Sequence, residues 1–206
     1  MNKSKFLLDK LFKFRTLTVS EYEYLITYQN DETAQYAREL ADKVRREYYS
    51  NEVFVRGLIE NVCKNDCFYC GIRKSNKSCD RYILSKEQIL ACCEDGYKLG
   101  FRTFVLQGGE NVIPLKAVCE TVSEIRKRFP DCAITLSLGE YKKEEYQMMF
   151  DSGADRYLLR HETADMEHYE KLHPKEMSFE NRMRCLKSLK EIGFAVGCGF
   201  MVGSPY

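Results

Sequence analysis

Hydrophobic residues recur at helical spacing along roughly the first fifty positions of the chain. Ser4–Phe14 carries three leucines and a phenylalanine on one face, a second segment begins near Ser20, and a third covers Asp31–Tyr49. Apolar positions three and four residues apart are typical of amphipathic helices. Ser20 is a plausible N-cap, with glutamates in the turn that follows it. None of the three segments groups chemically reactive side chains, so we predict an N-terminal helical cap over residues 1–50.

From residue 51 to 206 the pattern changes to β-rich runs that alternate with helical ones. Alternating strands and helices predict βαβ units and a mostly parallel sheet. No Gly-x-Gly-x-x-Gly follows the first strand, which favours a (β/α) TIM-type barrel over a dinucleotide-binding fold. The predicted strands are Val53–Ile59, Thr103–Gln107, Cys132–Leu138, Arg156–Arg160 and Ala195–Val202, and the predicted helices are 85–100, Val112–Phe129, Lys142–Asp151, Met166–Leu172 and Ser178–Ile192.

A full barrel of this type has eight units, whereas this chain stops at its fifth predicted strand. The ending Met201-Val-Gly-Ser-Pro-Tyr206 is typical of the middle of a βα loop. We therefore expect an incomplete barrel of strands 1–5, in a chain that is part of a longer protein. On its own, such a piece is expected to be poorly soluble or inactive.

Charge and composition exclude several classes of function. The 32 Lys and Arg residues nearly balance the 31 Asp and Glu residues, which argues against a polybasic nucleic-acid clamp. No apolar run reaches the ~18–20 residues of a membrane span, and early charges argue against a secretory signal. The chain has ten cysteines, long helical periodicities and only four prolines, a combination unlike a secreted disulfide scaffold. We expect a cytoplasmic protein with neither nucleic-acid nor membrane partners.

Three of the cysteines are closely spaced directly after the first predicted strand. Cys63, Cys67 and Cys70 form a C-x3-C-x2-C loop. Three thiolates can hold three irons of a 4Fe–4S cluster and leave the fourth iron open to a substrate. The alternative is a four-cysteine zinc site completed by Cys79. The spacing favours the cluster, because it is unlike the paired C-x2-C knuckles of zinc ribbons.

This loop resembles the signature of the radical S-adenosylmethionine (SAM) family, whose C-x3-C-x-aromatic-C motif ends the first barrel strand. The resemblance implies that the three cysteines bind a 4Fe–4S cluster and that Tyr69 packs near the adenine of SAM. In that family, SAM chelates the open iron and is reductively cleaved. The resemblance also implies a reductant such as ferredoxin or flavodoxin.

Within this family the chain is most similar to the HydE group of FeFe-hydrogenase maturases. That group implies a role in H-cluster assembly, with other hydrogenase maturases as partners and a small or organometallic iron–cysteine substrate. The biotin synthase and methylornithine synthase group is the alternative within the family. The similar stretches are Asn65–Lys74, Val105–Glu110, Thr135–Glu140, Asp155–Ala164 and Ser178–Arg182.

The ends of the next two strands supply polar candidates, because barrel active sites lie at the carboxyl ends of the strands. Gly108 and Gly109 permit close backbone approach and Glu110 can accept from an ammonium group, although a bare Gly-Gly pair is also typical of a plain turn. The resemblance assigns this segment to the SAM amino group. Thr135 and Ser137 face the same side and suggest a polar ligand, although a hydroxyl bonded to backbone would explain Ser137 equally well.

The fourth strand ends in Arg160 and Glu162, which project to the same side; a plain ion pair is the alternative explanation. By resemblance, Arg182 and Met201 also face SAM. Together the candidates on the substrate side are Gln107, Thr135 and Arg160, and the SAM-binding candidates are Tyr69, Gly108, Gly109, Glu110, Ser137, Glu162, Arg182 and Met201. We expect His161 to be structural and His168 and His173 to be exposed. The remaining cysteines have no ligand spacing and are interpreted as core or surface thiols.

Overall fold

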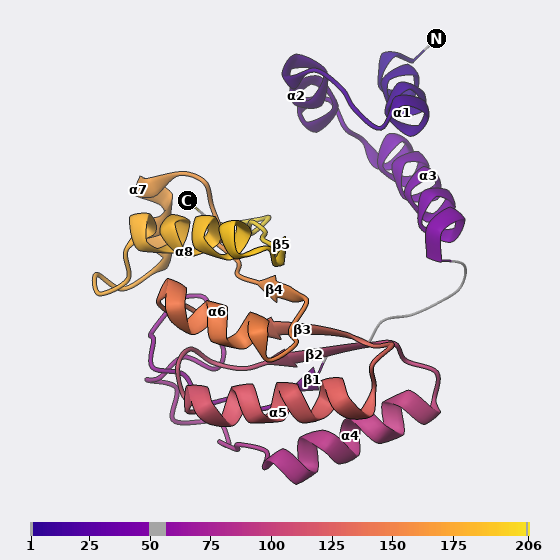
Figure 1. Cartoon of the computed structure of the whole chain (residues 1–206). Helices are drawn as coiled ribbons and strands as arrows, with labels where there is room; N and C mark the ends of the chain where they lie inside the picture. Colours follow the sequence, from indigo (N-terminus) through magenta and orange to yellow (C-terminus); the bar gives the residue numbers. More distant parts are fainter. Residues whose placement is uncertain (1, 50–56, 205) are drawn as a thin grey trace. The chain divides into compact units, whose positions relative to one another are not determined.

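The computed structural model describes residues 2–49, 57–204 and 206. These fall into two compact units, one within Met1–Val55 and the other within Arg56–Tyr206, and each is described by itself (Figure 1). The predicted start of the first strand, Val53, lies outside the described residues.

The N-terminal unit consists of the three predicted helices: α1 (Lys3–Phe14), α2 (Val19–Thr27) and α3 (Asp31–Tyr49). Leu7, Leu8 and Leu40 are buried among them. The prediction that Ser20 caps the second helix is wrong. Thr18 is the N-cap, because Glu21 lies at the reciprocal position and completes a capping box with it.

The second unit is built on a five-stranded parallel sheet in the order β1-β2-β3-β4-β5. The strands are β1 (Gly57–Leu58), β2 (Thr103–Gln107), β3 (Ala133–Ser137), β4 (Arg156–Leu158) and β5 (Ala195–Gly197). This confirms the prediction of a partial (β/α) barrel. The last two strands are shorter than predicted, and beyond them an isolated bridge joins Glu162 and Phe200.

Four helices cover the outer face of this sheet: α4 (Lys86–Lys98), α5 (Leu115–Arg128), α6 (Lys143–Asp151) and α8 (Phe179–Ile192) (Figure 1). The short α7 (Met166–Leu172) precedes α8. Ser85 caps α4 with Gln88 in a capping box, as predicted. Helix α5 begins later than predicted, because a residue before proline is disfavoured in the helical conformation and Pro114 is the N-cap.

Strand alternation separates a buried outer face from a more open inner face. The core lies between the helices and the strand residues Phe104, Leu106, Ile134, Leu136 and Tyr157. The alternate residues of β2 and β3 are only half-buried. Because all five strands are parallel, their carboxyl ends meet at one edge of the sheet. The loops that carry the predicted chemistry leave from this edge.

No helix in the described ranges is long and apolar enough to cross a membrane.

Candidate active site

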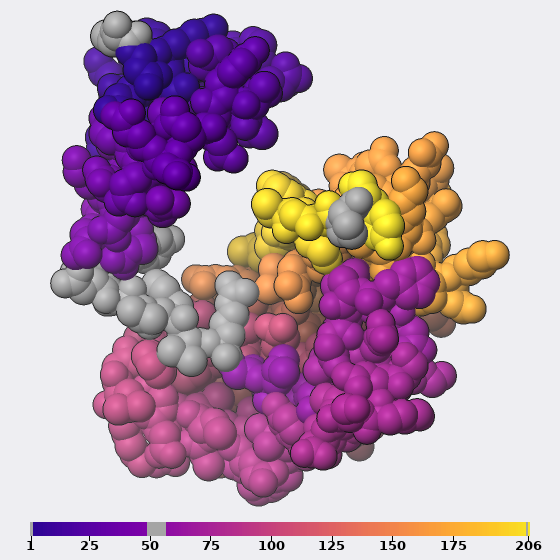
Figure 2. Space-filling model, turned by 180° about the vertical axis from the view of Figure 1, so that it is seen from behind, coloured from indigo at the N-terminus to yellow at the C-terminus, as the bar shows by residue number. Residues whose placement is uncertain are grey.

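The cysteine loop follows β1 and is anchored at its tip by residues more than one hundred positions away. The backbone amide of Phe68 donates to the carbonyl of Leu172 at the end of α7, at 3.0 Å. The thiol of Cys67 lies 3.5 Å from the thioether sulfur of Met177, in the loop between α7 and α8. In Figure 2 the segment that follows β1, in purple and magenta, forms much of the visible surface of this unit. The loop thus has a defined conformation fixed by neighbouring elements.

Cys63, Cys67 and Cys70 are all half-buried on this loop. Burial, together with Glu110 and the neighbouring Cys63 and Cys70, raises the pKa of the Cys67 thiol to about 12, while a hydrogen bond with Tyr69 lowers it. The three thiols are therefore close enough to interact. Yet within the described residues no three His, Cys, Asp or Glu side chains converge as they would around a single metal ion. Cys79 lies instead 3.6 Å from the side-chain amide of Asn61.

The Gly108-Gly109 turn after β2 lies directly against the base of the cysteine loop. A Cβ atom at Gly109 would overlap the carbonyl oxygen of Val62 and the Cα of Cys63, and one at Gly108 would overlap the carboxylate of Glu60. Glu60 is almost fully buried and accepts from the backbone amides of Val62 and Gly109. Both glycines are thus required by loop packing, and sequence reasoning missed Glu60.

A charged cluster forms where the loops after β2 and β3 meet α8. Arg182 Nη2 lies 2.7 Å from Glu110 Oε1, and Arg182 Nε lies 2.8 Å from Glu140 Oε1. Sequence reasoning found Glu110 and Arg182 but missed Glu140. Its position gave a usable signal, because Glu140 follows strand three just as Glu110 follows strand two.

Burial and charge act in opposite directions on this cluster. Arg182 is almost fully buried, which lowers its pKa, but Glu110 and Glu140 raise it more strongly, so the guanidinium stays charged. Burial raises the pKa of Glu140, while Arg182 lowers it. A buried cation beside two carboxylates matches a zwitterion, since the guanidinium can bind a carboxylate and a glutamate can accept from an ammonium.

Tyr69 in the cysteine loop is hydrogen-bonded to a buried histidine at the end of α7. The Tyr69 hydroxyl lies 3.1 Å from His173 Nε2, and the two rings meet edge to face. His173 Nδ1 lies 2.9 Å from the carbonyl oxygen of Tyr169, so Nδ1 carries the proton and Nε2 accepts from Tyr69. The prediction that His173 is exposed is wrong, because α7 packs on the cysteine loop and leaves only 3% of the residue accessible.

His168 was also predicted to be exposed, and it is half-buried. Its ring nitrogens lie 3.1 Å from the Thr163 hydroxyl and 2.7 Å from the Ser204 hydroxyl. His161 is half-buried as well, and its Nδ1 has no hydrogen-bond partner among the described residues. The sequence gives no signal for these contacts, because they depend on how the loops after β4 and β5 meet.

The remaining candidates lie at the carboxyl edge of the sheet. Gln107 at the end of β2 lies opposite Ser137 at the end of β3 in the parallel register. Thr135 lies two positions before Ser137, on the same half-buried side of β3. After β4, Arg160 Nε lies 3.6 Å from Glu162 Oε1; the Arg160 side chain is largely exposed and that of Glu162 is buried. Met201 donates its backbone amide to the carbonyl of Glu162 at 2.8 Å. The structure brings Arg160 and Glu162 together, as their spacing predicted.

Comparison with known proteins decides the family. The protein-family model described as "Radical SAM superfamily" matches residues 59–206 of this sequence. This range includes the cysteine loop and all the other candidate residues. The chain belongs to the radical SAM superfamily.

The relatives of this radical SAM chain include a hydrogenase maturase. The chain is 46% identical over 169 residues to "[FeFe] hydrogenase maturase subunit HydE" of Thermotoga maritima, a match that covers 81% of this chain and 48% of the relative. It is 28% identical over 199 residues to "3-methylornithine synthase" of Methanosarcina acetivorans, covering 95% of this chain and 56% of the relative. The chain thus spans about half the length of the curated relatives it matches.

Solved structures agree on the fold. The crystal structure of methylornithine synthase (PylB) superposes with a TM-score of 0.82 at 27% identity, covering 96% of this chain and 59% of that one. The crystal structure of HydG, a maturase of the [FeFe]-hydrogenase, gives a TM-score of 0.79 at 21% identity, covering 98% and 46%. Both share the architecture described above.

A radical SAM chain needs a place for a 4Fe–4S cluster, and the donor set of the cysteine loop fits one. Soft thiolates are the ligands that iron–sulfur clusters use, and each of three cysteines can bind a different iron. Ligands of different irons need not converge on one point, whereas four zinc ligands must lie ~2.3 Å from a single ion. Cys79, the fourth ligand that the zinc alternative needs, lies beside the side-chain amide of Asn61.

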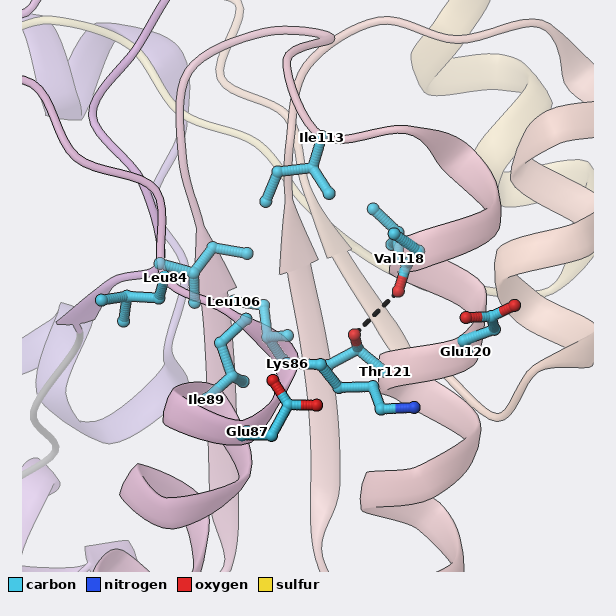
Figure 3. Close-up of a pocket in the computed structure, with 11 residues that line it drawn as sticks. Leu84, Lys86, Glu87, Ile89, Leu106, Ile113, Val118, Glu120 and Thr121 are labelled. Atoms are coloured by element: carbon cyan, nitrogen blue, oxygen red, sulfur yellow. Dashed lines mark hydrogen bonds between the residues drawn. The ribbon is translucent and has the colours of Figure 1, made fainter.

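A separate cavity of about 280 Å³ lies between α4 and α5 on the outer side of the sheet (Figure 3). Its walls are mostly apolar, with Lys86, Glu87 and Glu120 at the rim. The Thr121 hydroxyl within it donates its one proton to the carbonyl of Ala117 at 2.7 Å, so it is not free to donate to a ligand. This cavity contains none of the candidate residues.

Proposed function

We propose that this chain carries the SAM-cleaving site of a HydE-type radical SAM enzyme that takes part in assembling the active site of FeFe-hydrogenase. The observation that supports it best is the position of the cysteine loop. The Gly108-Gly109 turn connects the loop directly to Glu110, which is paired with Arg182. Thiolates for a cluster and a charged pair for an amino acid are therefore contiguous.

The cofactors of the proposal are a 4Fe–4S cluster held by Cys63, Cys67 and Cys70, and SAM. When bound, they supply the reductive cleavage of SAM. Glu110 would accept from the amino group of SAM, with Gly108 and Gly109 beside it, and Arg182 would bind its carboxylate. Tyr69 would lie at the adenine, and Ser137, Glu162 and Met201 would complete the SAM contacts.

The protein's own residues bind, orient and exclude water around this chemistry. The Glu110–Arg182 pair is preformed, so neither side chain must be ordered when SAM binds. Gln107, Thr135 and Arg160 lie near the same edge of the sheet and would face the substrate. We infer a small or organometallic iron–cysteine substrate, a reductant such as ferredoxin or flavodoxin, and other hydrogenase maturases as partners.

The HydE assignment rests on 46% identity, against 28% for methylornithine synthase. Its test is complementation. Hydrogenase maturation reactions that lack only HydE should regain hydrogenase activity when the whole protein is added with SAM and reductant. A Cys63→Ala variant should restore no activity. Cleavage of SAM without any hydrogenase activation would place the protein elsewhere in the radical SAM superfamily.

A further inference from the structure

The segment 61–82, which contains the three cysteines, is closed at its base by paired backbone. Leu84 donates its amide to the carbonyl of Ile59 at 2.9 Å, and Asn61 donates to the carbonyl of Tyr82 at 3.2 Å. The Asn61 side chain adds two hydrogen bonds. Its amide group donates to the carbonyl of Asp80 at 2.6 Å, and its oxygen accepts from the backbone amide of Tyr82 at 2.8 Å. The two ends of the loop are thus held side by side.

The guanidinium of Arg81 connects this base to the far limb of the loop. It donates to the carbonyl of Asn61 and to three carbonyls of the turn that follows Cys70, those of Ile72 at 2.9 Å, Arg73 at 2.7 Å and Asn76 at 3.1 Å. Among the described residues Arg81 forms no ion pair, so these carbonyls are its partners. One side chain therefore bonds to backbone on both sides of the three cysteines.

Only arginine can make this set of bonds. Its planar guanidinium carries five N–H donors spread over three nitrogens, whereas lysine has three donors on one atom. Of the three far-limb carbonyls, that of Arg73 also accepts from the amide of Asn76 at 3.0 Å, whereas those of Ile72 and Asn76 have Arg81 as their donor in the described part of the chain. Without the guanidinium, this limb would keep its bonds to the near side of the loop, from the amides of Lys74 and Ser75 to Asn65 and Asp66, but would lose the hydrogen bonds of Arg81 that join it to the base.

We propose that Arg81 is a positioning residue for the iron–sulfur site: it fixes the limb after Cys70 against the base, so that the three thiols are held in one arrangement before iron binds. This inference rests on the proposed function, because it takes the loop as the cluster site. Residues that orient metal ligands typically change metal affinity by about 10- to 100-fold when they are replaced. An Arg81→Lys variant should accordingly lose iron at least about tenfold faster.

The test uses the whole protein, reconstituted anaerobically with iron and sulfide. Release of iron to a chelator is followed by the loss of cluster absorbance, and the reduced cluster is examined by electron paramagnetic resonance with and without SAM. Arg81→Lys should release iron at least about tenfold faster and give a broadened signal. Arg102→Lys is the matched control, since Arg102 also donates to two backbone carbonyls, Tyr97 and Phe101, but in another part of the chain. It should match the unmodified protein.

Equal iron release from Arg81→Lys and the unmodified protein would overturn the inference. Failure of the unmodified protein to take up a cluster would instead overturn the proposed function. If Arg81→Lys fails to fold, hydrogen exchange on the unmodified, cluster-free protein tests the inference instead. The amides of Lys74 and Asn76, bonded to Asn65 and Arg73, should be protected before iron is added. Exchange at the rate of an unstructured peptide would also contradict the inference.

Discussion

Arg182 Nη2 lies 2.7 Å from Glu110 Oε1, although 72 positions separate the two residues along the chain. Helix α8 supplies the arginine and the loop after β2 supplies the glutamate, so the contact exists only when the sheet has its barrel order. Glu140 lies beside the same guanidinium, so the cluster is a buried ion-pair network, and the proposed function makes it the site for a zwitterionic ligand.

Replacing Arg182 with methionine should destabilise the barrel unit strongly. Breaking a buried pair leaves its partners uncompensated, which costs about 3–5 kcal/mol of unfolding free energy. Urea unfolding of the protein without cofactors measures this. Arg184→Met is the control, because Arg184 is exposed on the same helix and bonds to Asn181. It should change the free energy by no more than about 0.5 kcal/mol. Equal losses for the two variants would show that the buried cluster is unimportant.

Gly109→Ala should displace the cysteine loop. The added Cβ would meet the backbone of Val62 and Cys63, which cannot move without shifting the first cysteine. Overpacking of this kind costs about 1–3 kcal/mol, and here it also disturbs a ligand. Gly71→Ala is the matched control in the same loop, since a Cβ there meets nothing within 4 Å. Iron and sulfide content after reconstitution should fall for Gly109→Ala alone; full cluster content in both variants would argue against this packing.

The Tyr69–His173 hydrogen bond predicts a coupling energy. His173→Phe keeps a ring beside Tyr169 but removes the acceptor for Tyr69, at a cost of about 0.5–1.5 kcal/mol. In a Tyr69→Phe background the same change should cost less, because that bond is already absent. A double-mutant cycle by urea unfolding measures the difference. Strict additivity would mean that the two side chains do not interact.

The same histidine gives the barrel unit a pH dependence. Burial lowers the pKa of His173, while its bond to Tyr169 raises it less, so the folded state binds a proton less readily than the unfolded chain. Stability is therefore complete above the unfolded pKa of ~6.5 and declines as the pH falls below it. Urea unfolding at pH 7.5 and 5.5 should show that the free energy of unfolding falls less on acidification for His173→Phe than for the unmodified protein. An identical fall in both proteins would exclude His173 as a source of the pH dependence of stability.

Adjacent cysteines should differ sharply in reactivity. Cys92 is exposed, whereas Cys93 is buried in the core and burial raises the pKa of its thiol to about 12. Because the thiolate is the nucleophile, Cys93 should react with iodoacetamide at least about 100-fold more slowly than Cys92 at pH 8. Peptide mass spectrometry after timed labelling distinguishes the two. Comparable labelling would mean that α4 does not pack as described.

The sequence predicted the sheet, the helices around it and the edge where the site lies, because hydrophobic period and strand–helix alternation are local properties. The cysteine spacing and the strand-end residues Glu110 and Glu162 are local in the same sense. The strand-end position of Glu140 is local too, but its pairing with Arg182, the burial of His173 and the bonds of Arg81 depend on contacts between distant segments. Nothing in the residues beside His173 distinguishes it from an exposed histidine, because its partner lies in the cysteine loop.

The central claim is that the three-cysteine loop holds a cluster that cleaves SAM. The most direct measurement is the yield of 5′-deoxyadenosine after anaerobic reconstitution of the whole protein and addition of dithionite and SAM. The unmodified protein and the Cys92→Ala variant should form 5′-deoxyadenosine, while Cys63→Ala, Cys67→Ala and Cys70→Ala should form none above background. No product from cluster-loaded protein, or equal product from a Cys63→Ala variant, would contradict the account.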